Sequence, residues 1–262
     1  LMVALVLFGL IGSAVVDERN AHMGAAPLSA RPSREHPLGT DGFGRDMLTQ
    51  VALGVPNTLR VGLLAGGVGV LIGAVLGLVA GYYRTALDTV IRSTSDVMLV
   101  IPALAILITI SAMVRVVTLE MMALIVGLLS WAVPARVIRS QTLSLRERTF
   151  VDMARLSGQN SLEIIFFEIL PNLFSYLAAA FVGAVSTGIL AAVGLEVLGL
   201  GPQLIPTVGR ILYDALQKLA LFRGMWWWWV PPIVLVALIF IGLLLTSVGM
   251  DRLANARLRG VE

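Results

Sequence analysis

Long apolar stretches separated by shorter polar segments set the pattern of this chain. A helix of about 20 apolar residues crosses the hydrocarbon core of a bilayer, and lipid admits only helices or closed barrels, whose backbone groups are all satisfied. The runs do not alternate between apolar and polar positions, so helices are predicted rather than a barrel. Six runs qualify, at residues 1–16, 59–82, 89–114, 120–138, 173–199 and 227–248.

Composition supports a polytopic membrane protein. Of the 262 residues, 58% are hydrophobic and only 13% are charged, whereas soluble domains carry about 25% charged residues. The predicted fold is therefore all-α, a membrane helical bundle of about six transmembrane helices with both termini on one side. The first run is short and lacks an initial methionine, which is typical of a truncated first span rather than a signal peptide.

The polar segments define the predicted organisation. Residues 17–58 form an extracytoplasmic loop that ends in a short amphipathic helix near residues 45–53. Residues 59–248 form a five-span core with a cytoplasmic loop at 141–172, and residues 249–262 form a cytoplasmic tail. Orientation rests on the densest group of arginines close to a span end, which favours the cytoplasm. This group is Arg136, Arg139, Arg146, Arg148 and Arg155.

Several kinds of chemistry are excluded by residue counts. Without cysteine the chain has no disulfide and no thiolate metal site, and its net charge of +3 reflects arginines beside the membrane rather than nucleic-acid binding. His36, Asp41 and Asp46 can be imagined as metal ligands, but turn and cap roles are favoured. Lys218 is the only lysine and follows Gln217, so the G-x-x-x-x-G-K-[ST] phosphate loop is absent. Any ATP must be hydrolysed by another subunit.

The second run carries four glycines spaced by four residues, at Gly69, Gly73, Gly77 and Gly81. This spacing lines them along one helix face and lets another helix approach closely. Packing inside this subunit is the favoured interpretation. The alternatives are a dimerisation surface or a helix interface that moves during translocation.

Two features of the third and fourth runs bear on transport. Asp96 lies within the third run, and a carboxylate inside the membrane is a functional hypothesis by default. Arg92 precedes it by one turn, however, at the spacing of an ion pair, so a salt bridge is favoured over ion coupling. Pro102 and Pro134 each remove a helical hydrogen bond and are predicted to kink their spans.

Four consecutive tryptophans open the last run. Indole rings favour the head-group region of a bilayer, so an anchoring belt is predicted. Stacking against a sugar ring or a peptide side chain in a pathway is the alternative. The four residues are Trp226, Trp227, Trp228 and Trp229.

The segment "FVDMARLSGQNSLEIIFFEILPN", residues 150–172, is too polar to cross a bilayer. Its pattern predicts a short helix that ends at Gly158, then a second helix that starts at Asn160 with Glu163 in the capping position. Pro171 interrupts the pattern before the next span. Such a pair of helices can lie on the bilayer surface or fill a groove of a partner. The apolar positions are Phe150, Met153, Ala154, Leu156, Leu162, Ile165, Phe166 and Ile169.

This segment resembles the EAA loop, the cytoplasmic coupling loop in permease subunits of binding-protein-dependent ABC transporters. The family pattern is roughly E-A-A-x-x-x-G, followed at a distance by I and then L-P-N. Met153 replaces an alanine of this pattern, and Glu168 stands where a histidine is usual. The matching residues are Asp152, Ala154, Gly158, Ile165, Leu170, Pro171 and Asn172.

The resemblance extends over residues 36 to about 257. "HPLGTDGFGRDMLTQVALG" is similar to the stretch before the second span in C-type subunits of the dipeptide, oligopeptide and nickel branch, and "RSQTLSLRERTFV" and "ILAAVGLEVLGLG" resemble that branch too. Ala192 occupies a usual glutamate position and Glu196 a usual serine position. Together with Asp96, Pro102 and the tryptophans, Glu196 is a candidate pathway or packing residue.

The resemblance implies a type I-like ABC importer permease in the cell inner membrane, surrounded by lipid and without catalytic activity. Its expected partners are a B-type permease, two ATPase subunits that bind ATP and Mg²⁺, and an extracytoplasmic binding protein. Peptides are the first choice of substrate, ahead of oligosaccharides and nickel. An ion-coupled secondary transporter using Asp96 or Glu196 is the alternative from another class. A membrane enzyme is disfavoured because no nucleophile stands near a base.

Overall fold

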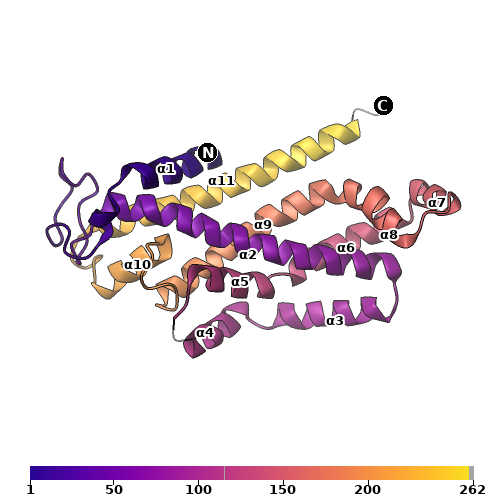
Figure 1. The fold of residues 1–262 in the computed structure, drawn as a ribbon, viewed down its shortest axis with the longest axis horizontal. Coiled ribbons are helices and arrows are strands. Elements are labelled where there is room, and N and C mark those ends of the chain that lie inside the picture. The colour runs from indigo at the N-terminus through magenta and orange to yellow at the C-terminus, as the bar shows by residue number, and fades with distance from the viewer. Residues whose placement is uncertain (115, 260–262) are drawn as a thin grey trace.

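The computed structural model describes residues 1–114 and 116–259 of the chain, and these form an all-α bundle with no named strand (Figure 1). The predicted fold class is therefore confirmed. The elements in chain order are α1 (Met2–Val15), η1 (Glu18–Ala21), α2 (Met47–Tyr83), α3 (Ala86–Val100), α4 (Ala103–Met113), α5 (Leu119–Leu129), α6 (Ala132–Arg146), α7 (Thr149–Leu156), α8 (Ser161–Glu163), η2 (Ile164–Ile169), α9 (Leu170–Val197), α10 (Val208–Gln217) and α11 (Trp226–Arg259).

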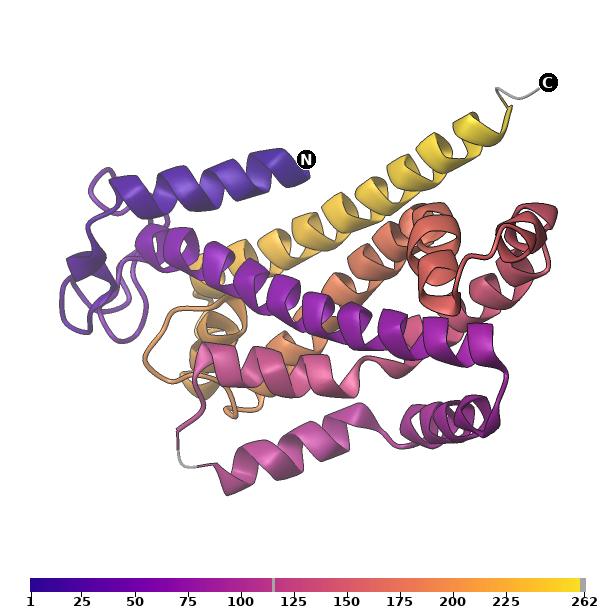
Figure 2. The ribbon, with the colours of Figure 1, turned by 45° about the vertical axis from the view of Figure 1, so that its right-hand side comes forward.

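Helix α2 runs through the centre of the bundle and packs against α5, α6 and α9 (Figure 2). The side chain of Asp46 caps its first turn by accepting a hydrogen bond from the Thr49 amide, at 2.8 Å. The amphipathic helix predicted near residues 45–53 is not a separate element, because it forms the first turns of α2. Met47 and Val51 there are buried against neighbouring protein rather than lying on lipid.

Three helical stretches are long and apolar enough to cross a membrane alone: Met47–Tyr83, Ser161–Val197 and Trp226–Met250. Two further spans are broken. Helices α3 and α4 meet at a bend of 80°, and α5 and α6 meet at 44°, so counting each pair once gives up to five spans. Helix α1 is a shorter apolar helix. The third and fourth predicted runs are therefore not the continuous helices that the hydropathy pattern indicates.

Proline accounts for only one of the two breaks. Pro102 stands at the N-cap of α4, and α3 ends shortly before it because a proline disfavours helical geometry at the preceding residue. In the other pair the break falls at Ser130 and Trp131, ahead of Pro134. Pro134 lies in the first turn of α6, where its missing amide costs no hydrogen bond. The predicted kink at Pro134 was therefore misplaced.

The glycines of α2 provide close contact with α6 inside this subunit, as predicted. A Cβ added at Gly73 would lie 2.7 Å from the Pro134 side chain, and one at Gly77 would lie 2.6 Å from the Ala135 carbonyl. Gly81 also faces α6, at Thr142, whereas Gly69 faces Gly127 and Ser130 at the end of α5. Only glycine permits this approach of the two backbones.

The end of the bundle opposite the α2–α3 turn carries the outer loop, which we define as residues 17–46 (Figure 1). Asp41 and Arg45 of this loop form an ion pair at 2.5 Å, and Arg45 also reaches Asp214 of α10 at 2.7 Å. Arg210 adds a second cation to Asp214 at 3.0 Å. These four side chains, of which Asp41, Arg45 and Asp214 are buried and Arg210 is partly buried, form the outer ion network that joins the outer loop to α10.

Turn and cap roles for the polar residues of the outer loop are confirmed. Asp41 accepts hydrogen bonds from the amides of Phe43 and Arg45, at 2.8 and 2.9 Å. His36 Nδ1 lies 3.0 Å from the Asp46 carboxylate. Across the described residues, no group of three or more histidine and carboxylate side chains is arranged to hold a metal ion.

The tryptophan belt prediction is wrong for two of its four residues. Trp227 and Trp228 are buried in a cluster with Met47 and Ile211, and the Trp227 indole donates a hydrogen bond to the Thr40 carbonyl at 3.1 Å. Trp226 is 53% exposed and remains compatible with an anchor. The outer loop and α10 cover the other rings, and hydropathy alone does not reveal this cover.

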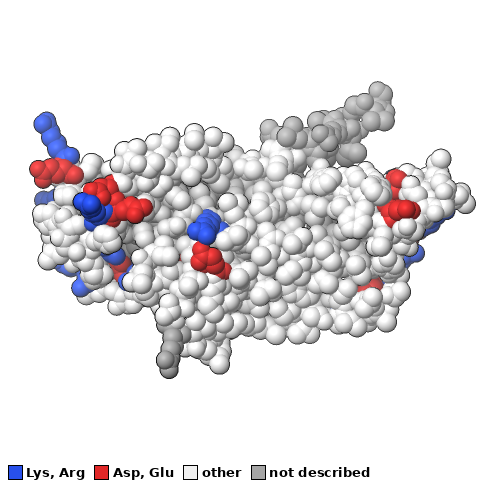
Figure 3. Space-filling model, viewed as in Figure 1, with Lys and Arg blue, Asp and Glu red and all other residues white. Residues whose placement is uncertain are grey.

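Charged side chains gather at the two ends of the face shown in Figure 3, and the band between them carries one adjacent pair of opposite charges and is otherwise uncharged. This distribution is what a bilayer requires, because isolated charges in hydrocarbon are costly. The band therefore marks the part of the surface that meets lipid or other apolar partners.

Candidate coupling elbow and translocation cavity

Residues 149–172 form a compact elbow at the end of the bundle opposite the outer loop (Figure 1). Helix α7 ends at Leu156, and Gly158 turns the chain with a φ of +83°. This left-handed conformation favours glycine. Asn160 and Glu163 then form the predicted capping box, with bonds of 3.0 and 2.7 Å. The helix, glycine turn and second helix expected from the sequence are confirmed.

One face of the elbow packs onto the bundle. Val151 and Ala154 of α7 are buried against Ile165 and Ile169, in a cluster that also contains Tyr82 of α2. Phe150 is partly buried against this same cluster. The sequence analysis grouped Phe150 and Ala154 with Met153 and Leu156 as apolar positions free for a bilayer or a partner, but both pack within their own subunit.

The opposite face of the elbow is uncovered. Met153 is 64% exposed and Leu156 is 88% exposed. Beside them, Asp152 and Arg155 form an exposed ion pair at 2.9 Å. A well-anchored helix thus presents two large apolar side chains and a charged pair on its free side.

Pro171 does not interrupt the second helix, contrary to the sequence prediction. The chain is helical from Ser161 to Val197, with a π-helical stretch at Ile164–Ile169 just before Leu170 and Pro171. Pro171 stands in the first turn of α9, directly after the π-helical stretch, which is a position where a missing proline amide is tolerated. The Asn172 side chain donates to the Glu168 carbonyl at 2.7 Å and supports the same turn.

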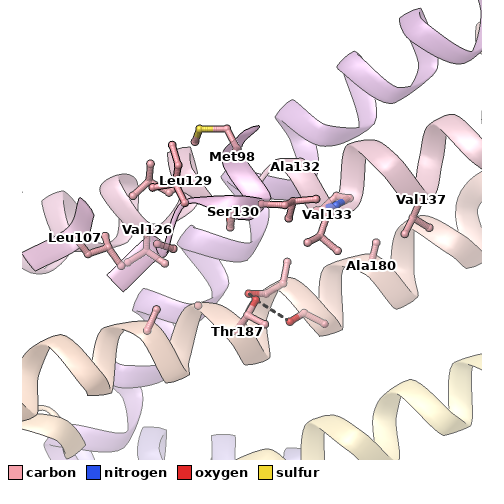
Figure 4. Close-up of a pocket in the computed structure, with 18 of the residues that line it drawn as sticks. Met98, Leu107, Val126, Leu129, Ser130, Ala132, Val133, Val137, Ala180 and Thr187 are labelled. Atoms are coloured by element: carbon pink, nitrogen blue, oxygen red, sulfur yellow. Dashed lines mark hydrogen bonds between the residues drawn. The ribbon is translucent and has the colours of Figure 1, made fainter. Parts of the chain in front are cut away.

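A cavity of about 700 Å³ opens between both broken helix pairs and α9 (Figure 4). The break at Ile101 and Pro102 lines one side, and the break at Ser130 lines another. Helix α9 contributes small residues, which leave the space open: Ala179, Ala180, Gly183, Ala184, Gly188 and Ala191.

The polar groups of the cavity are hydroxyls and free backbone. Tyr176, Thr187 and Ser130 face it, and the hydroxyls of Thr187 and Ser130 donate to carbonyls of their own helices. The last carbonyls of α3 and the first amides of α4 lack helical partners because a helix ends there. Non-helical backbone at membrane depth is tolerated only inside protein or beside water. The cavity is therefore suited to a hydrated passage with few fixed contacts.

The structure separates the pathway candidates proposed from sequence. Pro102 lines the cavity. Asp96 does not, and it pairs with Arg136 of α6 rather than with Arg92, because α3 and α6 bring residues 40 positions apart together. Glu196 is buried at 3% exposure and lies against Gly201 and Gly209, away from the cavity lining.

None of the four tryptophans is among the residues that line the cavity. The cavity residues that sequence reasoning missed are Tyr176, Thr187 and Ser130. The one sequence signal for these residues is a hydroxyl group within an apolar run. Many residues that line no cavity carry the same signal.

Comparison with known proteins assigns this architecture to a class. Residues 73–260 match the family described as binding-protein-dependent transport system inner membrane component. The chain belongs to this family of transport permeases, and it is a multi-pass membrane protein.

Curated relatives place the chain near peptide permeases. It is 36% identical over 187 residues to the dipeptide transport system permease protein DppC of Alkalihalophilus pseudofirmus, covering 71% of this chain and 61% of that protein. It is 34% identical over 191 residues to the glutathione transport system permease protein GsiD of Pectobacterium atrosepticum, covering 72% and 62%. The chain thus spans about three fifths of these relatives' length.

A solved structure shares the fold. An inward-facing form of the MetNI methionine ABC transporter superimposes with a TM-score of 0.61 at 17% identity, covering 80% of this chain and 97% of the matched chain. The likeness supports the predicted ABC importer permease fold.

Proposed function

We propose that this chain is a permease subunit of an ATP-driven, binding-protein-dependent importer of peptides. It forms half of the translocation pathway, and a B-type permease forms the other half. Two ATPase subunits, which hold ATP and Mg²⁺, bind the elbows, and an extracytoplasmic binding protein delivers the substrate. The chain itself performs no bond chemistry. Alternating access moves the substrate across the membrane.

The two-sided elbow is the observation that carries this proposal. Its inner face is fixed to α2 through Val151 and Tyr82, while Met153 and Leu156 are left on the free face. An amphipathic helix of this kind suits insertion into a groove on a partner. A force applied to α7 by an ATPase would pass directly into η2, on which α7 packs, and through the shared apolar cluster to α2.

Peptides are favoured by the names of the relatives and by the cavity. Its lining offers apolar walls and hydroxyls, which accommodate varied side chains without fixing any one of them. Oligosaccharide transport is disfavoured because it relied on tryptophans that stack against sugar rings. Trp227 and Trp228 are instead buried in internal packing. Nickel is disfavoured because no histidine or carboxylate lines the cavity.

The decisive test compares two exposed leucines at opposite ends of the molecule. Leu156 is 88% exposed on the elbow and Leu204 is 94% exposed beyond α9. Burying such a side chain in a partner contributes about 1.5–3 kcal/mol, so Leu156→Asp should weaken ATPase binding about 10- to 150-fold. Leu204→Asp is the matched control and should leave ATPase binding unchanged.

Association would be measured by copurification of the ATPase subunits with the permease complex, and uptake with a labelled dipeptide in proteoliposomes. The proposal expects Leu156→Asp to lose both while membrane insertion persists. Normal ATPase binding and uptake by Leu156→Asp would refute the coupling role of the elbow.

A further inference from the structure

A second, smaller pocket of about 210 Å³ lies between α3 and α6. Three arginines line it, Arg92, Arg136 and Arg139, together with Ser95 and the carboxylate Asp96, and Ile91 and Ala135 form apolar walls. We call it the arginine pocket. It is lined by none of the residues that surround the translocation cavity, and the proposed transport mechanism gives it no role.

The pocket has an excess of positive charge. Arg139 is held by Asp88 through two hydrogen bonds of 2.5 and 2.8 Å, and Arg136 pairs with Asp96. Among the described residues, no carboxylate lies within ion-pair distance of Arg92. Three cations against two anions leave a local charge of +1, and several N–H donors of Arg92 and Arg136 remain available.

The surroundings of the pocket are apolar and exposed. Leu87 on α3 lies one turn before Ile91 on the same side of the helix and is 56% exposed, and Ile91 itself is partly exposed at the pocket wall. The pocket begins two turns after the α2–α3 turn, at the end of the bundle where the charged side chains gather. Arginines beside an apolar surface extend their head groups toward the level of lipid phosphates.

We propose that the arginine pocket binds the phosphodiester of an anionic phospholipid head group. A phosphodiester carries one negative charge, which balances the excess, and its two free oxygens match the planar fork of a guanidinium. The acyl chains would run along Leu87 and Ile91. Basic pockets between membrane helices bind anionic lipid head groups by this chemistry. Lipid binding here is separate from transport and requires no ATPase.

Native mass spectrometry of the purified permease with added phosphatidylglycerol or phosphatidylcholine tests this assignment. Arg92→Gln is the informative variant because it leaves no carboxylate unpaired. A surface arginine near anionic lipid contributes about a fivefold gain in affinity, so Arg92→Gln should lower phosphatidylglycerol binding about fivefold. Asp96→Asn releases Arg136 and should raise it. Arg60→Gln removes an exposed arginine distant from the pocket and should change nothing.

Three results decide the matter. Selective binding of phosphatidylglycerol that falls in Arg92→Gln, rises in Asp96→Asn and is unchanged in Arg60→Gln supports the proposal. Equal binding by Arg92→Gln and Arg60→Gln would overturn it. Displacement of the lipid by inorganic phosphate would also overturn the proposal. So would displacement by a peptide with a free carboxylate but not by the same peptide as its amide. Either result would assign the pocket to an anion from the aqueous phase.

Discussion

Removing Asp214 should detach the outer loop from the rest of the molecule. Asp214 is 1% exposed and accepts from Arg45 at 2.7 Å and from Arg210 at 3.0 Å. Asp214→Ala leaves the buried Arg45 and the partly buried Arg210 with only Asp41 to balance them. Removing one partner of a buried ion pair costs about 3–5 kcal/mol, since the remaining charge is uncompensated. The free energy of unfolding should fall by this amount.

The matched control is an exposed ion pair. Arg60 and Glu120 are 2.8 Å apart with side chains 60% and 50% exposed, and such pairs contribute about 0–1 kcal/mol. Denaturant unfolding in mixed micelles, followed by tryptophan fluorescence, compares Asp214→Ala with Glu120→Ala. The fluorescence of Trp228 reports on unfolding of the end that holds the outer loop and α10, because Trp228 packs in the same cluster as Ala215 of α10. A loss for Asp214→Ala within about 1 kcal/mol of the control would refute the reasoning.

Three further substitutions have expected effects on stability. Gly77→Ala places a methyl group 2.6 Å from a carbonyl of α6 and should destabilise by about 1–3 kcal/mol, whereas Gly67→Ala, which meets nothing closer than 4.0 Å, should be neutral or stabilising in thermal unfolding. Trp228→Ala empties a fully buried site and should cost about 3–5 kcal/mol; Trp226→Ala, at an exposed position, should cost far less in the same assay. Asn160→Ala removes the capping box and should cost about 0.5–2 kcal/mol, seen as faster hydrogen exchange in the elbow with no change at the outer loop.

Local chemistry explains what the sequence predicted well. The elbow follows from Gly158 and from the three-residue spacing of Asn160 and Glu163, because these residues satisfy nearby backbone groups by themselves. The glycine stripe of α2 likewise needs only helical periodicity to be recognised. The all-α class follows from run length and from the hydrogen-bonding demands of lipid.

The errors share a different cause, which is dependence on distant partners. Asp96 has Arg92 at a suitable spacing, yet it pairs with Arg136 because α6 lies beside α3. Trp228 has the composition of a membrane anchor, yet the outer loop and α10 cover it. The break at Ser130 precedes the nearest proline, and the sequence carries no local signal that places it there.

Helix α2 mechanically connects the two ends of the protein. Its 37 residues correspond to about 55 Å, well beyond the roughly 30 Å of a hydrocarbon core. Met47 at one tip is locked among the tryptophans, and Tyr82 at the other rests on the elbow. A single uninterrupted helix therefore joins the outer loop to the elbow, so a tilt of α2 at one end displaces the residues packed on it at the other end.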